Sequence, residues 1–251
     1  MYQSSNICLS VCHKLSFLRS LEKWLCLFFK NSSKTLEFEI ACLDIHAFND
    51  EYDTKLCAVG LWGDISARLL SLPDLAEVCS EQLKGDVIPR SILIESLEGI
   101  PYLFVSLGDG SVINFIITKS LTTSKNKLNY ELTERRKVVL GTQPTILKKF
   151  RSYKPVLSNN IFACSDRPSV ISSTNQKLVY SSVNLKQVEY MCEMNAKAYP
   201  QSLALLSAGT LRIGTMDSIQ KLHIRSVQLN ETARRISYQA ETQTFGIITF
   251  R

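Results

Sequence analysis

The sequence contains few of the residues from which catalytic and metal sites are usually built. It has three histidines, at positions 13, 46 and 223, and its eight cysteines include no Cys-x-x-Cys pair. It also lacks the Gly-x-Ser-x-Gly motif of hydrolases and the His-Glu-x-x-His motif of zinc proteases. We therefore expect a protein that is not an enzyme and that holds no metal or cofactor.

Long uninterrupted apolar runs are absent as well. The apolar stretch 15–29 is too short to cross a membrane, and it contains Arg19, Glu22 and Lys23. Its apolar residues recur at helical spacing, so it is either a short helix or a segment outside the folded body. Cysteines inside apolar runs, such as Cys42, indicate a reducing compartment, the nucleus or the cytoplasm, and we expect no membrane association.

The sequence does contain a recurring series of short β-strand patterns. Residues 161–180 form three apolar runs, rich in β-branched and aromatic residues and separated by turn residues. This pattern predicts a three-stranded antiparallel meander. The strongest strand of each comparable unit begins at Leu56, Tyr102, Ile161, Ser202 and Thr244.

A spacing near 40 to 50 residues, with about four short strands per unit, is typical of β-propeller blades. The longer interval before Ile161 contains the loop 118–130, which we interpret as an insertion. We therefore predict an all-β fold, a partial β-propeller of about four WD40-like blades, each a four-stranded antiparallel sheet. About four blades are too few to close a ring, so the chain is expected to be a piece of a larger propeller protein.

Several local features of these units can be predicted. Pro89 lies within a strand pattern, which favours an edge strand or a bulge. Residues 75–83 are either a short helix or a strand. The Gly-Asp-Gly sequence at 108–110 predicts a tight hairpin turn rather than a phosphate loop. Residues 135–140 and 145–150 are expected to pair as the two strands of another hairpin.

Two features could contact other molecules. The net charge is +6, and basic residues concentrate at 135–137 and 148–151. This segment either approaches an acidic partner, such as nucleic acid, or is a solvated strand edge whose charges prevent aggregation, which we favour. Trp62 ends an apolar strand beside a turn, so it is either a core residue or an aromatic anchor for a protein partner.

Eight blocks of sequence, taken together and in order, are similar to one known family. Two of them are Gly-Leu-Trp-Gly-Asp-Ile-Ser-Ala-Arg at 60–68 and Phe-Ala-Cys-Ser-Asp-Arg-Pro at 162–168. The others lie at 41–45, 88–93, 107–110, 140–145, 182–186 and 219–225. They resemble the family of the large subunit of the UV-damaged-DNA-binding complex, the adaptor of cullin 4-type ubiquitin ligases. The resemblance runs from about Leu36 to the last residue.

The resemblance implies a division into three segments. Residues 1–34 have no match and contain the possible helix. Residues 35–218 are similar to the later blades of the second of three propellers, and residues 219–251 to the crossover into the next propeller. In the family, the second propeller holds the cullin scaffold.

The resemblance also implies a function and a binding site. The chain is expected to be a non-catalytic adaptor fragment of a cullin-RING ligase linked to DNA-damage recognition and repair. Within the matching blocks, Glu39, Trp62 and Arg90 are expected to contact a cullin 4-type protein. WD40 substrate receptors are partners of the full-length family protein only, and DNA contact is at most indirect, through a partner subunit. The alternative is a triple-propeller scaffold of pre-mRNA cleavage and polyadenylation or of splicing.

Overall fold

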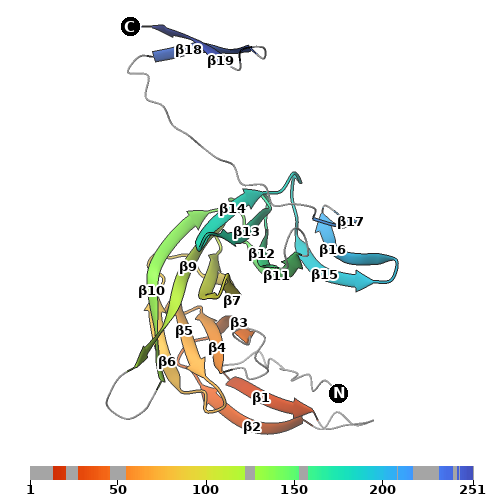
Figure 1. The fold of residues 1–251 in the computed structure, drawn as a ribbon. Coiled ribbons are helices and arrows are strands. Elements are labelled where there is room, and N and C mark those ends of the chain that lie inside the picture. The colour runs from red at the N-terminus through yellow and green to blue at the C-terminus, as the bar shows by residue number, and fades with distance from the viewer. Residues whose placement is uncertain are drawn as a thin grey trace. The chain divides into compact units, whose positions relative to one another are not determined.

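The structure is a computed structural model of the 251-residue chain. It describes residues 14–20, 28–45, 55–121, 128–152, 158–207, 209–216, 232–239, 242 and 244–250. The chain divides into two compact units, Met1–Gln220 and Lys221–Arg251. In both units the described elements are strands joined by turns, and none of them is a helix (Figure 1). The described residues therefore contain no helix that is long and apolar enough to cross a membrane.

The first unit contains three four-stranded antiparallel sheets, which we call blades 1 to 3. Blade 1 comprises β3 (Ile40–Ile45), β4 (Leu56–Leu61), β5 (Ser66–Ser71) and β6 (Glu77–Gln82). Blade 2 comprises β7 (Pro89–Leu97), β8 (Ile100–Leu107), β9 (Ser111–Leu121) and β10 (Leu128–Val139). Blade 3 comprises β11 (Ile146–Ser152), β12 (Ser158–Cys164), β13 (Ser169–Thr174) and β14 (Lys177–Ser182). The meander predicted at 161–180 is thus confirmed as the last three strands of blade 3.

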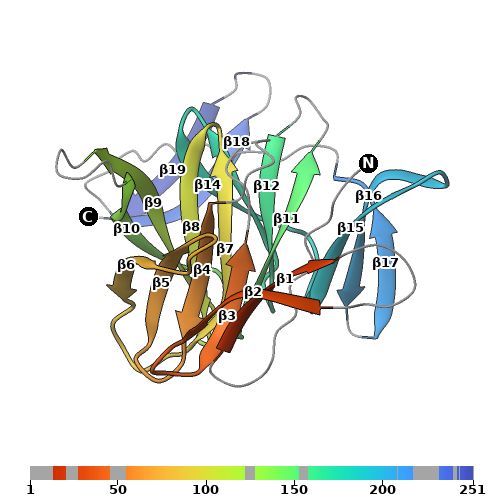
Figure 2. The ribbon, with the colours of Figure 1, turned by 90° about the horizontal axis from the view of Figure 1, so that it is seen from below.

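A fourth sheet follows blade 3. It comprises β15 (Tyr190–Ala196), β16 (Tyr199–Ser207) and β17 (Thr210–Gly214), so its described part has three strands rather than the predicted four. The first strands of successive sheets contact one another, β3 with β7, β7 with β11, and β11 with β15 (Figure 2). Sequential meanders that meet along their first strands are the arrangement of propeller blades, which confirms the predicted partial β-propeller.

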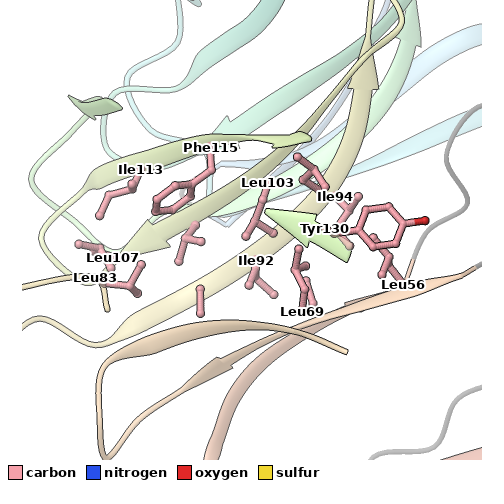
Figure 3. Packing of buried hydrophobic residues seen from close by; sticks show 14 residues of the cluster. Leu56, Leu69, Leu83, Ile92, Ile94, Leu103, Leu107, Ile113, Phe115 and Tyr130 are labelled. Atoms are coloured by element: carbon pink, nitrogen blue, oxygen red, sulfur yellow. The ribbon is translucent and has the colours of Figure 1, made fainter. Parts of the chain in front are cut away.

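Apolar clusters fill the spaces between neighbouring sheets. Blades 1 and 2 enclose a cluster that includes Leu56, Leu69, Leu103 and Phe115, all at most 1% exposed (Figure 3). Similar clusters lie between blades 2 and 3 and between blade 3 and the fourth sheet. Strand β4 is buried along its whole length because alternate residues pack on the two faces of blade 1. This explains its uninterrupted apolar sequence.

The N-terminal helix prediction is wrong where the structure describes the segment. Residues 15–20 belong to β1 (Lys14–Ser20), which pairs antiparallel with β2 (Phe28–Thr35). Residues 21–27 lie outside the described residues. A short apolar run with helical spacing also suits a strand, and the pairing partner that decides between them is not visible in the periodicity.

The predicted hairpin of residues 135–140 and 145–150 is also wrong. Strand β10 pairs with β9, and β11 pairs with β12, so the two segments belong to different blades. The residues between them form the link from blade 2 to blade 3. A strand–turn–strand sequence has the same pattern whether the chain returns to its own sheet or crosses to the next.

The other local predictions are resolved by the strand pairing. Residues 75–83 contain the strand β6 rather than a helix. The register of β7 shifts at Arg90, directly after Pro89, which confirms the predicted bulge. The Gly-Asp-Gly segment joins β8 to β9 as a hairpin turn.

The second unit contains one described hairpin, β18 (Thr232–Gln239) paired antiparallel with β19 (Thr244–Phe250). The predicted unit that begins at Thr244 is thus the second strand of this hairpin. Residues 219–231, at the start of the expected crossover, lie outside the described residues.

Candidate functional site

The topology places Glu39, Trp62 and Arg90 at the same end of blades 1 and 2. Glu39 directly precedes β3, and Trp62 directly follows its antiparallel partner β4. The Trp62 N–H donates to the Glu39 carbonyl oxygen at 2.9 Å. Arg90 is the second residue of β7, whose first residue packs on Gly60 near the end of β4. All three predicted site residues are exposed, and Trp62 is 52% exposed.

Trp62 begins the turn after β4, which is one residue longer than the matching turn of blade 2. Residues 62–65 join β4 to β5, whereas residues 108–110 join β8 to β9. The Gly108 N–H donates to the carbonyl oxygen of Ile88, as the Trp62 N–H does to that of Glu39. Trp62 therefore occupies the backbone position of Gly108, and its side chain leaves the sheet instead of joining the core.

Arg90 lies at the bulge of β7, where an extra residue redirects the side chain. Blade 1 has the same register shift at Ala41. The Arg90 Nε atom lies 3.8 Å from the place that a Cβ atom on Gly108 would take. Blade 1 therefore combines a small bulge residue with Trp62 at the turn, and blade 2 combines Arg90 at the bulge with a glycine at the turn. Each blade contributes one large side chain to this end.

Charged hydrogen bonds hold the turn that carries Trp62. Asp64 Oδ2 accepts from the Arg68 guanidinium at 2.7 Å, and Asp64 Oδ1 accepts from Ser66 Oγ at 2.7 Å. The second guanidinium nitrogen donates to Glu77 Oε2 at 3.0 Å. Hydrogen bonds to Asp64 and Glu77 raise the pKa of Arg68 above its ordinary value. Charge-assisted bonds of this kind are stronger than neutral ones, so the turn presents Trp62 from a fixed backbone.

Aspartates also stabilise the matching turns of the next two blades. Asp109 accepts from the Ser111 N–H at 3.0 Å and pairs with Lys137 at 3.3 Å. Asp166 accepts from the Thr142 N–H at 3.0 Å and from the Thr142 hydroxyl at 2.9 Å. Partial burial tends to raise the pKa of Asp166, but these bonds and one from the next backbone N–H hold its pKa below the ordinary value. These carboxylates fix turns and links.

Several basic residues of β10 and β11 contact other groups of the same chain. The Arg135 guanidinium donates to two backbone carbonyls at the end of blade 1. Lys137 pairs with Asp109, and Lys148 Nζ lies 4.5 Å from the centre of the Tyr190 ring. The interpretation as charged strand positions therefore fits better than an open nucleic-acid-binding patch.

The described part of the chain gives little indication of a metal site or of a reactive thiol. No group of three or more His, Cys, Asp or Glu residues there could hold a metal ion. The three histidines at 13, 46 and 223 lie outside the described residues. Burial raises the pKa of Cys42, Cys57 and Cys164 to about 12, so these thiols are protonated at neutral pH.

Sequence reasoning identified Trp62 but missed Phe38, whose ring packs on Gly63 in the same turn. The available signal was a phenylalanine between Glu37 and Glu39, in the link to β3. The sequence alone did not show which glycine would lie beneath it.

The comparisons with known proteins agree with this architecture. A family model described as the RSE1/DDB1/CPSF1 second beta-propeller matches residues 16–216. The match begins within the segment 1–34, where we expected none.

Curated relatives share about half of the aligned residues with this chain. DNA damage-binding protein 1 of Drosophila melanogaster is 52% identical over 223 residues, 88% of this chain. DNA damage-binding protein 1 of Solanum lycopersicum is 50% identical over 217 residues, 86% of the chain. DNA damage-binding protein 1a of Arabidopsis thaliana is 50% identical over 213 residues, 84% of the chain. The aligned part is 19% of the length of each relative. The chain therefore belongs to the RSE1/DDB1/CPSF1 second beta-propeller family.

Proposed function

We propose that this chain is the cullin-contacting part of a non-catalytic adaptor of a ubiquitin ligase linked to DNA-damage recognition and repair. The observation that carries the proposal is the exposed row of Glu39, Trp62 and Arg90 at one end of blades 1 and 2. Membership of the propeller family and the similarity to proteins named DNA damage-binding protein 1 support it.

The row has the composition of a protein-binding site. A tryptophan that is 52% exposed offers a large apolar area, and tryptophan is enriched among residues that dominate binding energy. Glu39 and Arg90 carry opposite charges at the same end of the blades, which favours one orientation of the partner. A matching cullin surface would present an apolar side chain together with a basic and an acidic group.

The remaining chemistry supports a scaffold rather than an enzyme. The aspartates at the blade turns accept hydrogen bonds that fix the backbone, and several basic residues contact other protein groups. We propose that any contact with DNA is made through a partner subunit, and that the protein acts in the nucleus. A full adaptor also needs the parts of the relatives that this chain does not span.

A binding experiment with the 251-residue chain and the N-terminal region of a cullin 4-type protein tests the proposal. We expect Trp62→Ala to weaken binding by at least about 30-fold, or roughly 2 kcal/mol, and Trp62→Ala with Arg90→Glu to abolish it. Thermal unfolding should be unchanged because both side chains are exposed.

Tyr199→Ala is the matched control, because Tyr199 is 51% exposed but lies on the fourth sheet. Equal binding by the wild type and the double variant would refute the site. Copurification with pre-mRNA processing factors, without cullin, would favour the alternative scaffold.

A further inference from the structure

Gly63 is a glycine for a reason other than backbone conformation. Its φ is not positive, unlike that of Gly85, Gly99, Gly110 and Gly209. A Cβ atom at position 63 would stand 3.1 Å from Phe38 Cγ and closer still to Phe38 Cδ1. The Phe38 ring therefore occupies the space that any larger residue at position 63 would need.

The ring is anchored in the protein on one side. Phe38 is half-buried and packs against the apolar cluster on the face of blade 1 that points away from blade 2. It directly precedes Glu39, whose carbonyl oxygen accepts the Trp62 N–H. Phe38 and Gly63 thus flank the hydrogen bond that joins the two site residues.

Blade 2 has a smaller side chain at the position of Phe38, and this side chain packs on the first residue of the turn rather than on the second. Val87 precedes Ile88, the counterpart of Glu39, and Val87 Cγ1 lies 3.4 Å from the place of a Cβ atom on Gly108. That distance is an ordinary contact, whereas the contact of Phe38 with position 63 leaves no room for a side chain. The larger apolar surface is therefore built into the blade that carries Trp62.

We infer that Phe38 is a specificity-determining residue of the partner surface, and that Gly63 keeps its ring in place. This inference rests on the function proposed above. The half-buried ring adds apolar area on the turn that begins with Trp62, so the preferred partner presents an apolar side chain at this point. A partner with a polar group there loses affinity, because that group would be desolvated against the ring without a hydrogen-bond partner.

The test measures the affinity of the 251-residue chain for the N-terminal region of a cullin 4-type protein. We expect Phe38→Ala and Gly63→Ala each to weaken binding about tenfold. The variant with both changes should bind no more weakly than either single variant, because both changes remove the ring from the same place. Phe38→Leu keeps an apolar side chain and should retain most of the affinity.

Gly214→Ala is the matched glycine control, because Gly214 has no positive φ and a Cβ atom there meets nothing within 4 Å. It should bind as the wild type does. Thermal unfolding identifies any variant that fails to fold. In that case, the affinities of Phe38→Leu and Phe38→Ser are compared to test the role of the ring. Phe38→Ser should bind as weakly as Phe38→Ala.

The outcomes separate the two proposals. If the wild type does not bind the cullin region, the proposed function fails and the inference fails with it. If the wild type binds and Trp62→Ala does not, but Phe38→Ala and Phe38→Ser bind at wild-type affinity, the inference alone is overturned. If the double variant lost affinity by the product of the two single losses, this result would likewise show that Gly63 does not act through Phe38.

Discussion

The Ile94 backbone N–H in β7 donates a 2.7 Å hydrogen bond to Asp44 Oδ2 in β3. This bond joins the first strands of blades 1 and 2 at a residue that is 1% exposed. Neighbouring blades otherwise meet mainly through apolar side chains. The carboxylate therefore supplies a directional contact where a backbone donor would be buried without a partner.

Replacing Asp44 tests the contribution of this contact to stability. We expect Asp44→Ala to lower the free energy of unfolding by about 2 kcal/mol, because it leaves the Ile94 N–H buried and unpaired. Asp44→Asn keeps an acceptor oxygen and should lose less than half as much. Urea unfolding followed by circular dichroism measures the stability of both variants. Equal unfolding midpoints for Asp44→Ala and the wild type would show that this hydrogen bond does not stabilise the fold.

The Asp166 carboxylate predicts a pH-dependent contribution to stability. Its pKa is lowered in the folded protein, so its stabilising effect is present above the unfolded pKa and is lost as the pH falls through the folded pKa. The stability difference between the wild type and Asp166→Asn should thus be constant from about pH 5 to 7 and shrink below about pH 4.

Denaturant unfolding at a series of pH values measures this difference. Thr142→Val removes the hydroxyl bond to Asp166 but keeps the backbone bonds, so it should reduce the pH dependence in part. A difference that grows as the pH falls would have the wrong sign for a depressed pKa.

Three glycines allow backbone strain to be separated from steric conflict. Gly214→Ala should be neutral, because a Cβ atom there meets nothing and φ is not positive. Gly209→Ala places alanine at a φ of 72° in open space and should cost about 1 kcal/mol. Gly110→Ala has a φ of 80° and directs the new Cβ atom into the Gly141 backbone, so its cost should be clearly larger.

Thermal unfolding of the three variants gives the order directly. A Gly110→Ala variant as stable as Gly209→Ala would show that the link between blades 2 and 3 can move away from the β8–β9 turn. The backbone N–H groups of Leu140 and Gly141 both donate to the Gly110 carbonyl oxygen, which argues against such movement.

The buried thiols make a further prediction. Burial raises the pKa of Cys57 and Cys164 to about 12, so neither forms the reactive thiolate at pH 8. The exposed Cys192 should therefore be alkylated by iodoacetamide well before them. Peptide mass spectrometry of the native and the guanidinium-unfolded chain measures the order. Equal labelling of Cys57 and Cys192 in the native chain would contradict the burial of β4.

Strand positions were predictable from the sequence wherever both faces of a strand are buried. The run Leu56–Leu61 is apolar throughout because it lies between two clusters, and its ends are marked by turn residues. Sequence patterns did not show whether the segment 141–144 turns back or crosses to the next blade. In the structure, Thr142 of this segment donates to Asp166, which lies 24 residues away in the next blade.

The candidate site was predictable only in part. The position of Trp62 beside a turn was visible in the sequence, but the sequence did not show whether its side chain would face solvent or the core. The packing of Phe38 on Gly63 depends on how the link into β3 lies over the turn after β4. Such contacts between separate loops leave no periodic pattern in the sequence.

The difference in length between the turns after β4 and β8 has a consequence for how such a protein can diverge. The two turns differ by one residue, yet the strands that flank each of them keep their side chains in the apolar layer between blades 1 and 2. Successive blades can in this way acquire different binding surfaces from one repeated framework.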